Sequence, residues 1–184
     1  AYAQLLEHHS QMGKDFLAEA LQLPNLASLI EQCETVDIDA LVKAHQTVEH
    51  HLARAHQAAF MALYDSLQDF PSDRSLKNTL LHWITVLQKP AGLARAQHQY
   101  QQALNMTARL AAFKALSRAK DPAVATEAIE HFYNTFKDEP LAMDKWLAIQ
   151  ASNPVAGTLS RVDALLHHPA FIKTNPNKVY ALVG

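Results

Sequence analysis

The sequence is poor in cysteine, in glycine and in excess charge of either sign. Its 184 residues include one cysteine, Cys33, and four glycines, and the formal net charge is −2. A lone cysteine excludes an internal disulfide and fits a reducing compartment, so we expect a cytoplasmic protein. The small net charge gives no electrostatic reason to expect nucleic acid or an anionic membrane as a partner. The sequence also has no run of about 18 apolar residues and no secretion signal at its N-terminus.

The spacing of a zinc-hydrolase motif is absent too. A helix that contains H-E-x-x-H holds zinc through two histidines four residues apart, and the glutamate polarises the metal-bound water. The chain has eleven histidines, but no two of them are three or four residues apart. His45 with Glu49 and Glu127 with His131 each lie one helical turn apart, yet two ligands do not make a zinc site. We therefore predict no catalytic residue, no metal site and no cofactor in this chain.

Apolar residues make up 49% of the chain and recur with helical spacing almost everywhere, without the two-residue alternation of a strand. Asp121-Pro122, Asn153-Pro154 and Asn175-Pro176 each place an N-cap acceptor before a proline suited to the first helical position. These and similar boundaries predict helices over residues 73–88, 91–104, 106–119, 122–137, 140–152, 154–166 and 176–183.

The first 70 residues differ from the rest. Residues 38–67 contain neither proline nor glycine and have an apolar stripe, which predicts one long helix near 37–67, or two helices that break near His50-His51. From 71 to 184, pairs of predicted helix starts recur every 31 to 34 residues, the length scale of stacked helical hairpins. We predict an all-α fold of about ten to twelve helices, an irregular α-solenoid or superhelix of antiparallel helix pairs. A compact bundle would give the same periodicity.

An ordered series of polar landmarks in the second half of the chain indicates a known family. The landmarks are Asn105-Met106-Thr107, Met143-Asp144-Lys145-Trp146, Gln150-Ala151-Ser152-Asn153-Pro154, Leu165-Leu166-His167-His168-Pro169, and Asn175-Pro176-Asn177-Lys178 leading into Leu182-Val183-Gly184. Through them the chain resembles the C-terminal helical domain of the bacterial aminopeptidases N, the alanyl aminopeptidases of the M1 zinc metallopeptidase family. The resemblance favours the superhelix, because the family's C-terminal domain is a superhelix of antiparallel helix pairs.

The resemblance also implies a non-catalytic part of a larger enzyme, since the family's H-E-x-x-H and G-x-M-E-N segments are absent. The parent would hydrolyse N-terminal amino acids from peptides with zinc bound in its catalytic domain. Residues 1–184 would be a fragment of one helical domain, with N-terminal helices over 1–70 and stacked pairs over 71–184, that caps the active-site chamber. Its partners would be the catalytic domains of the same polypeptide and the peptide substrates.

Both ends of the chain look cut, and an excised piece of a solenoid exposes apolar surface at its ends. We therefore also expect self-association of the isolated fragment. The alternative function is a freestanding α-solenoid scaffold that binds a peptide or protein partner.

One segment is a candidate for contact with substrate. In the family, the segment around the motif Asn-Pro-Asn-(Arg/Lys) faces the enclosed active-site chamber. Asn175, Asn177, Lys178 and Tyr180 occupy the matching positions, so the resemblance implies that they line the substrate chamber. The second basic residue of the motif is Tyr180 here, which removes its charge. The residues alone also support a structural interpretation, in which Asn175-Pro176 caps a helix with an exposed first turn.

Overall fold

A computed structural model describes all residues from 1 to 184 and is entirely helical. It holds eleven α-helices and no strand, which confirms the predicted all-α fold. In chain order, the elements are α1 (Tyr2–Glu7), the 3-10 helix η1 (His9–Gln11), α2 (Lys14–Ala20), α3 (Leu26–Ile30), α4 (Ile38–Ser66), α5 (Pro71–Thr85), α6 (Pro90–Gln102), α7 (Met106–Leu116), α8 (Pro122–Phe136), α9 (Pro140–Ala151), α10 (Thr158–Leu165) and α11 (Pro176–Val183). None of them is both long and apolar enough to serve as a membrane span.

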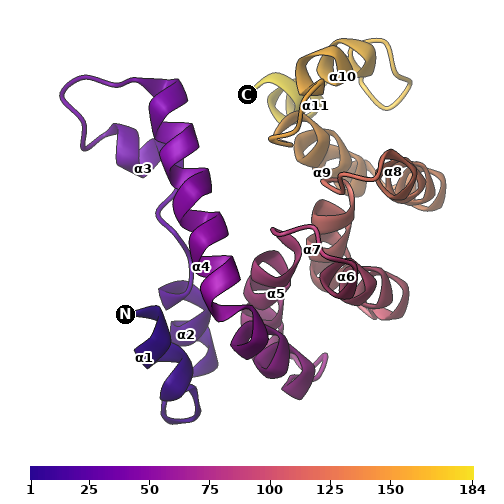
Figure 1. Cartoon of the computed structure of the whole chain (residues 1–184). Coiled ribbons are helices and arrows are strands. Elements are labelled where there is room, and N and C mark those ends of the chain that lie inside the picture. Colours follow the sequence, from indigo (N-terminus) through magenta and orange to yellow (C-terminus); the bar gives the residue numbers. More distant parts are fainter.

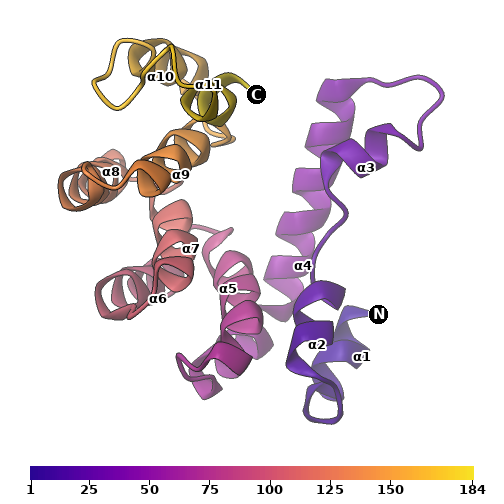
Figure 2. The same cartoon turned by 180° about the vertical axis from the view of Figure 1, so that it is seen from behind.

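The helices form a curved arc (Figures 1 and 2). From α5 to α9 each helix packs on its successor, and α11 packs on α9. Helices α5, α7, α9 and α11 follow the inner side of the arc, while α6, α8 and α10 follow the outer side (Figure 1). Helix α4 forms the opposite limb and faces α9 and α11 across the opening. This is the predicted superhelix of stacked helix pairs, in which each pair contacts its neighbours.

Most helix starts follow local signals in the sequence. Side chains accept a hydrogen bond from the first turn at five starts, through Asn25, Asp37, Asn105, Asp121 and Asn175. A proline occupies the first turn of α5, α6, α8, α9 and α11, where its missing N–H costs no hydrogen bond. Each side-chain cap stabilises its helix by about 1 kcal/mol. Local chemistry therefore fixes where most inner-side helices begin.

One predicted helix start is wrong. Asn153-Pro154 signals a helix from residue 154, but α10 begins at Thr158, after Gly157 takes a left-handed φ of 83°. The buried Asn153 turns its amide towards the neighbouring repeat, where Nδ2 donates to the backbone oxygen of Ser117 at 2.7 Å. Its Oδ1 has no hydrogen-bond partner, so this side chain does not cap a helix. A long-range contact has replaced the local cap.

The apolar core runs along the arc as one cluster of 29 buried residues. Trp83 on α5 stacks on Phe60 of α4 with ring centroids 5.3 Å apart, and its Nε1 donates to the backbone oxygen of Leu21 at 2.8 Å. Trp146 on α9 donates in the same way to the oxygen of Ile129 on α8 at 3.0 Å. Burial of one large apolar side chain contributes about 1.5–3 kcal/mol to stability, and the hydrogen bond from the indole N–H fixes the orientation of the ring. These two side chains therefore fix inner helices to their neighbours.

Helix α4 is one unbroken element of 29 residues, so the alternative of two helices that break near His50-His51 is not what forms. Its buried residues, Ala53, Phe60, Leu63 and Tyr64, all lie in its second half. In the first half Ile38 is exposed, and α3 is the short helix that packs beside it (Figure 1). The arc therefore holds α4 mainly by its C-terminal half.

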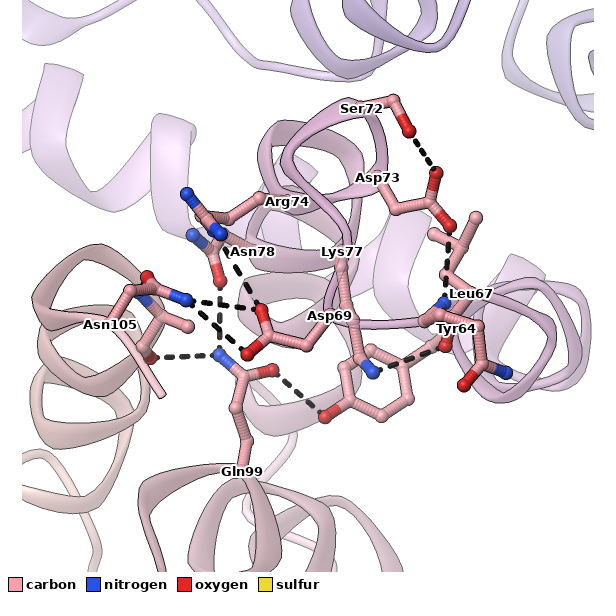
Figure 3. A network of polar contacts seen from close by, with 12 residues as sticks. Tyr64, Leu67, Asp69, Ser72, Asp73, Arg74, Lys77, Asn78, Gln99 and Asn105 are labelled. Atoms are coloured by element: carbon pink, nitrogen blue, oxygen red, sulfur yellow. Dashed lines mark hydrogen bonds and ion pairs between the residues drawn. The ribbon is translucent and has the colours of Figure 1, made fainter. Parts of the chain in front are cut away.

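A network of polar contacts joins α4, α5, α6 and α7 at the bend of the arc (Figure 3). The Tyr64 hydroxyl donates to Gln99 Oε1 at 2.9 Å, and Gln99 Nε2 donates to Asn78 Oδ1 at 3.0 Å and to the oxygen of Ala108 at 2.9 Å. Asn105 Nδ2 donates to the carboxylate of Asp69 at 3.2 Å while Oδ1 caps α7. An unsatisfied buried polar group costs about 1–3 kcal/mol, so this network holds α7 in a defined position.

Candidate functional site

The inner side of the arc contains a groove of about 790 Å³. Its walls come from α4, α5 and the end of α7, and it extends to the turn after α9 and to residues 22–26 before α3. The curvature brings these elements together, because α4 and α7 both pack on α5 (Figure 2). Ligand sites in proteins span roughly 300–1,000 Å³, so the groove is large enough for part of a peptide.

More cations than carboxylates line the groove. Lys114, Arg118 and Lys120 line it from the end of α7 and the residues that follow, whereas Glu49 on α4 is its one carboxylate. Neither Lys114 nor Arg118 forms an ion pair. Lys114 lies in the last turn of α7 and Arg118 lies two residues after its end, where the helix dipole stabilises a positive charge by about 0.3–1 kcal/mol. The helix therefore supports two cations that no carboxylate neutralises directly.

The groove walls only partly desolvate these two cations, since Lys114 is still exposed and Arg118 is half-buried. Desolvation lowers the pKa of Lys114, the nearby charge of Arg118 lowers it further, and Glu49 acts in the opposite direction. Desolvation also lowers the pKa of Arg118, again against the effect of Glu49. Arg118 Nε is buried without a partner, and Nη2 reaches the backbone oxygen of Ser152 only at 3.5 Å. The guanidinium thus keeps hydrogen-bond donors that the chain itself does not use.

The carboxylate of the groove is already engaged. His82 Nε2 on α5 donates to Glu49 Oε1 at 2.8 Å, which links α4 to α5. Burial alone would raise the pKa of Glu49, but the hydrogen bond and charge of His82, with the charges of His45 and His50, leave that pKa below its usual value. Glu49 is therefore an anion held by a histidine, and it moderates the positive field of Lys114 and Arg118 without pairing with either.

No group of three or more histidine, cysteine, aspartate or glutamate side chains lies close enough together to hold a metal ion. The two pairs considered from the sequence have other contacts: His45 meets the oxygen of Pro24 at 3.0 Å, and His131 meets the hydroxyl of Tyr100 at 2.9 Å. Glu49 binds His82, as described. The cations and hydrogen-bond donors of the groove are suited to an anion.

The segment with the Asn-Pro-Asn-Lys motif begins α11. Asn175 Oδ1 accepts from the backbone N of Asn177 at 3.0 Å, so Asn175 is the N-cap of this helix. Asn177 and Tyr180 are exposed on α11. Helix α11 lies on the inner side of the arc, near the C-terminal end of the chain (Figure 1). The structural interpretation of Asn175 is therefore observed, and the chamber-lining role of this segment stays a prediction.

Lys178 lies inside the fold rather than on its surface. Its Nζ donates to the backbone oxygen of Pro140 at 2.8 Å and lies 2.8 Å from Asp144 Oδ1. The contact with Asp144 is an ion pair without hydrogen-bond geometry, since that oxygen accepts no hydrogen bond. Lys178 thus ties α11 to α9.

Sequence reasoning considered Glu49 only with His45, as a possible metal pair, and did not single out His82, Lys114 or Arg118. Glu49 and His82 are 33 residues apart in the chain and meet only because α4 packs on α5. Lys114 and Arg118 did leave a signal in the sequence, because they are two like charges four residues apart near a predicted helix end, and such charges repel each other when they are close.

Comparison with known proteins gives a consistent result. The family described as "Domain of unknown function (DUF3458_C) ARM repeats" matches residues 1–184. Aminopeptidase N of Caulobacter vibrioides is 31% identical over 178 residues, which are 92% of this chain and 20% of that protein. Aminopeptidase N of Escherichia coli K12 is 27% identical over 177 residues, 91% of this chain and 20% of that protein. The chain therefore spans about a fifth of the length of these relatives.

A solved structure shares the arc. The crystal structure of Legionella pneumophila aminopeptidase A in complex with aspartic acid matches 98% of this chain with a TM-score of 0.84 and 28% identity, and the match occupies 23% of that protein. The matched region of the aminopeptidase N relatives is their C-terminal part. The superhelical arrangement is thus common to this chain and to part of that solved aminopeptidase structure.

Proposed function

Since the chain belongs to the DUF3458_C family of ARM-repeat domains and matches the C-terminal fifth of bacterial aminopeptidase N, we propose that it caps the active-site chamber of an aminopeptidase. In this proposal the parent polypeptide removes N-terminal amino acids from peptides with zinc held in another domain. The family match over the whole chain is the observation that supports it best. The absence of a metal-binding group among these residues supports a non-catalytic role.

The shape of the chain gives a physical reason for a cap. An arc with a groove on its inner side can cover a catalytic face, exclude folded proteins and still admit a thin peptide. The α11 segment fits the same role, because Asn177 and Tyr180 are exposed on a helix at the inner side of the arc. In this proposal they and the N-cap Asn175 line the chamber, and Lys178 acts indirectly by holding α11 on α9.

Exposed apolar side chains on the surface are consistent with contacts to other domains of the same polypeptide. Large apolar side chains are exposed on separate elements, among them Leu104, Leu141 and Leu159. Covering such side chains is favourable by about 25 cal/mol per Å², so we propose that the catalytic domains cover part of them and that the isolated chain self-associates. Light scattering of the isolated chain over a range of concentrations checks this, and a strict monomer throughout would count against it. Cys33 is exposed and free, which supports a reducing, cytoplasmic setting.

The proposal is tested with the full polypeptide that contains this chain. We expect it to hydrolyse alanine anilide and unfolded peptides, and to lose that activity with a zinc chelator. A folded protein with the same N-terminal residues should be cleaved only after it is denatured. The isolated chain should hydrolyse none of these with added zinc. A full polypeptide without aminopeptidase activity, or without H-E-x-x-H in its sequence, would overturn the proposal and favour the freestanding scaffold.

A further inference from the structure

We infer that Lys114 and Arg118 form a binding site for a carboxylate group of a peptide in the concave groove. This inference deepens the proposed function and rests on it for the identity of the ligand as a peptide. The site itself rests on the geometry of the groove, which is independent of any enzymatic role.

The first argument is the unmet charge of the pair. Lys114 and Arg118 lie four residues apart at the end of α7 and line the same groove, yet neither has a carboxylate partner. The one carboxylate of the groove, Glu49, is bound by His82 at 2.8 Å. Arg118 is half-buried and Lys114 is exposed. The two nearby like charges repel each other, and an anion bound between them relieves that repulsion.

The second argument is the donors that Arg118 leaves unused. Its Nε is buried and out of a ligand's reach, but the only hydrogen bond of the side chain is that of Nη2 to the backbone oxygen of Ser152, at the long limit of 3.5 Å, so the terminal Nη groups keep unused N–H donors. A planar guanidinium binds a carboxylate through two parallel N–H donors, which is its strongest common interaction. Lys114 can supply a third donor from the preceding helical turn. An incoming carboxylate would therefore satisfy groups that the fold leaves open.

The fixed charges of the groove favour an anion. Lys114, Arg118 and Lys120 are positive and Glu49 is negative, so the groove has a net positive charge that an anionic ligand would neutralise. Glu49 repels a carboxylate, which has one negative charge, less than it repels a phosphate dianion. Gln46 and Thr79 line the same groove, and their polar side chains are suited to the amide groups of a peptide backbone.

Two parts of a peptide offer this chemistry: the C-terminal carboxylate and the side chain of an aspartate or glutamate. The test separates them with four probes on the full polypeptide, whose metal is removed by chelation so that binding is measured without turnover. Octaalanine with a free C-terminus is compared with octaalanine amide. The amide is also compared with the same amide in which one internal alanine is replaced by aspartate or by asparagine.

Lys114→Gln and Arg118→Gln are the test variants. Matched controls are Lys137→Gln, an exposed lysine at the C-terminal end of α8, and Arg54→Gln, an exposed arginine on α4, neither of which lines the groove. A hydrogen bond to a charged group is worth about 1.5–3 kcal/mol, so each test variant should weaken binding of the carboxylate probe about tenfold or more. The neutral probes and both controls should change less than about twofold.

If the test variants weaken binding of octaalanine with a free C-terminus alone, the site binds the C-terminal carboxylate. If they weaken binding of the aspartate-containing amide alone, the site binds an acidic side chain. Equal affinity for charged and neutral probes, or equal loss in the test and control variants, would overturn the inference. Tighter binding of inorganic phosphate than of either acid would also overturn it. Circular dichroism melts of the variants exclude misfolding as the cause of a loss. If the parent lacks peptidase activity, the proposed function fails, but the binding measurement still decides this inference.

Discussion

The buried contact between Lys178 and Asp144 leads to an asymmetric prediction for stability. The two charged atoms are 2.8 Å apart, and the side chains are 6% and 18% exposed. At an effective dielectric constant of about 20 their attraction is roughly 6 kcal/mol, but removing both ions from water costs several kcal/mol each. The net value of the pair is therefore small, and the cost of a substitution depends on which charge is left behind.

Asp144→Leu leaves the more buried ammonium with only the backbone oxygen of Pro140 as a partner. We expect it to lower the free energy of unfolding by about 3–5 kcal/mol, the usual cost of an uncompensated buried charge. Lys178→Met leaves the carboxylate, which water reaches more easily, so we expect a smaller loss of about 1–3 kcal/mol. The double variant should be less destabilised than Asp144→Leu alone, because no charge is stranded.

The assay is urea unfolding of the full polypeptide and its variants, followed by circular dichroism and by intrinsic fluorescence. Lys145→Met is the control, because this exposed lysine is next to Asp144 in the sequence and forms no ion pair; it should change stability by less than about 0.5 kcal/mol. A larger loss for Lys178→Met than for Asp144→Leu would refute the reasoning. So would a double variant in which the two losses simply add.

Three further predictions concern packing, a long-range contact and pH. Gly92→Ala should destabilise the chain by about 1–3 kcal/mol in urea unfolding despite a better helix propensity, because the new Cβ would overlap the carbonyl oxygen of Ile84; Gly13→Ala, with nothing within 4 Å, should change stability by less than about 0.5 kcal/mol. Asn153→Ala should cost about 1–3 kcal/mol in the same assay, because it leaves a buried carbonyl at the end of α7 unsatisfied. The folded pKa of Glu49 lies below the usual 4.5, so Glu49 stabilises the fold above that pH and loses this contribution as the pH falls through its folded pKa; Glu49→Gln should therefore destabilise the chain more near neutral pH than in acid.

The fold could be read from the sequence where local chemistry decides it. Asp121-Pro122 and Asn175-Pro176 do start helices, because a cap acceptor and a proline act within one turn. Asn153-Pro154 has the same pattern and does not, because its amide bonds to Ser117, 36 residues away. No local pattern contains that contact, since it exists only once two repeats stack.

The groove could not be predicted for the same reason. Glu49 and His82 come together through the packing of α4 on α5, and the position of Lys114 and Arg118 depends on where the polar network sets α7. The Asn-Pro-Asn-Lys motif shows the reverse case: the sequence indicated the helix start correctly, but not that Lys178 would be buried against Asp144. Burial of a lysine requires a partner whose place is known only in three dimensions.

The weak support of the amino-terminal half of α4 has a consequence for local unfolding. Backbone amides in this half, including those near His45, should exchange with deuterium through openings of much lower free energy than amides around Phe60. One wall of the groove, with Glu49 near its middle, thus belongs to a segment that can fray and close again while the stacked repeats opposite remain folded.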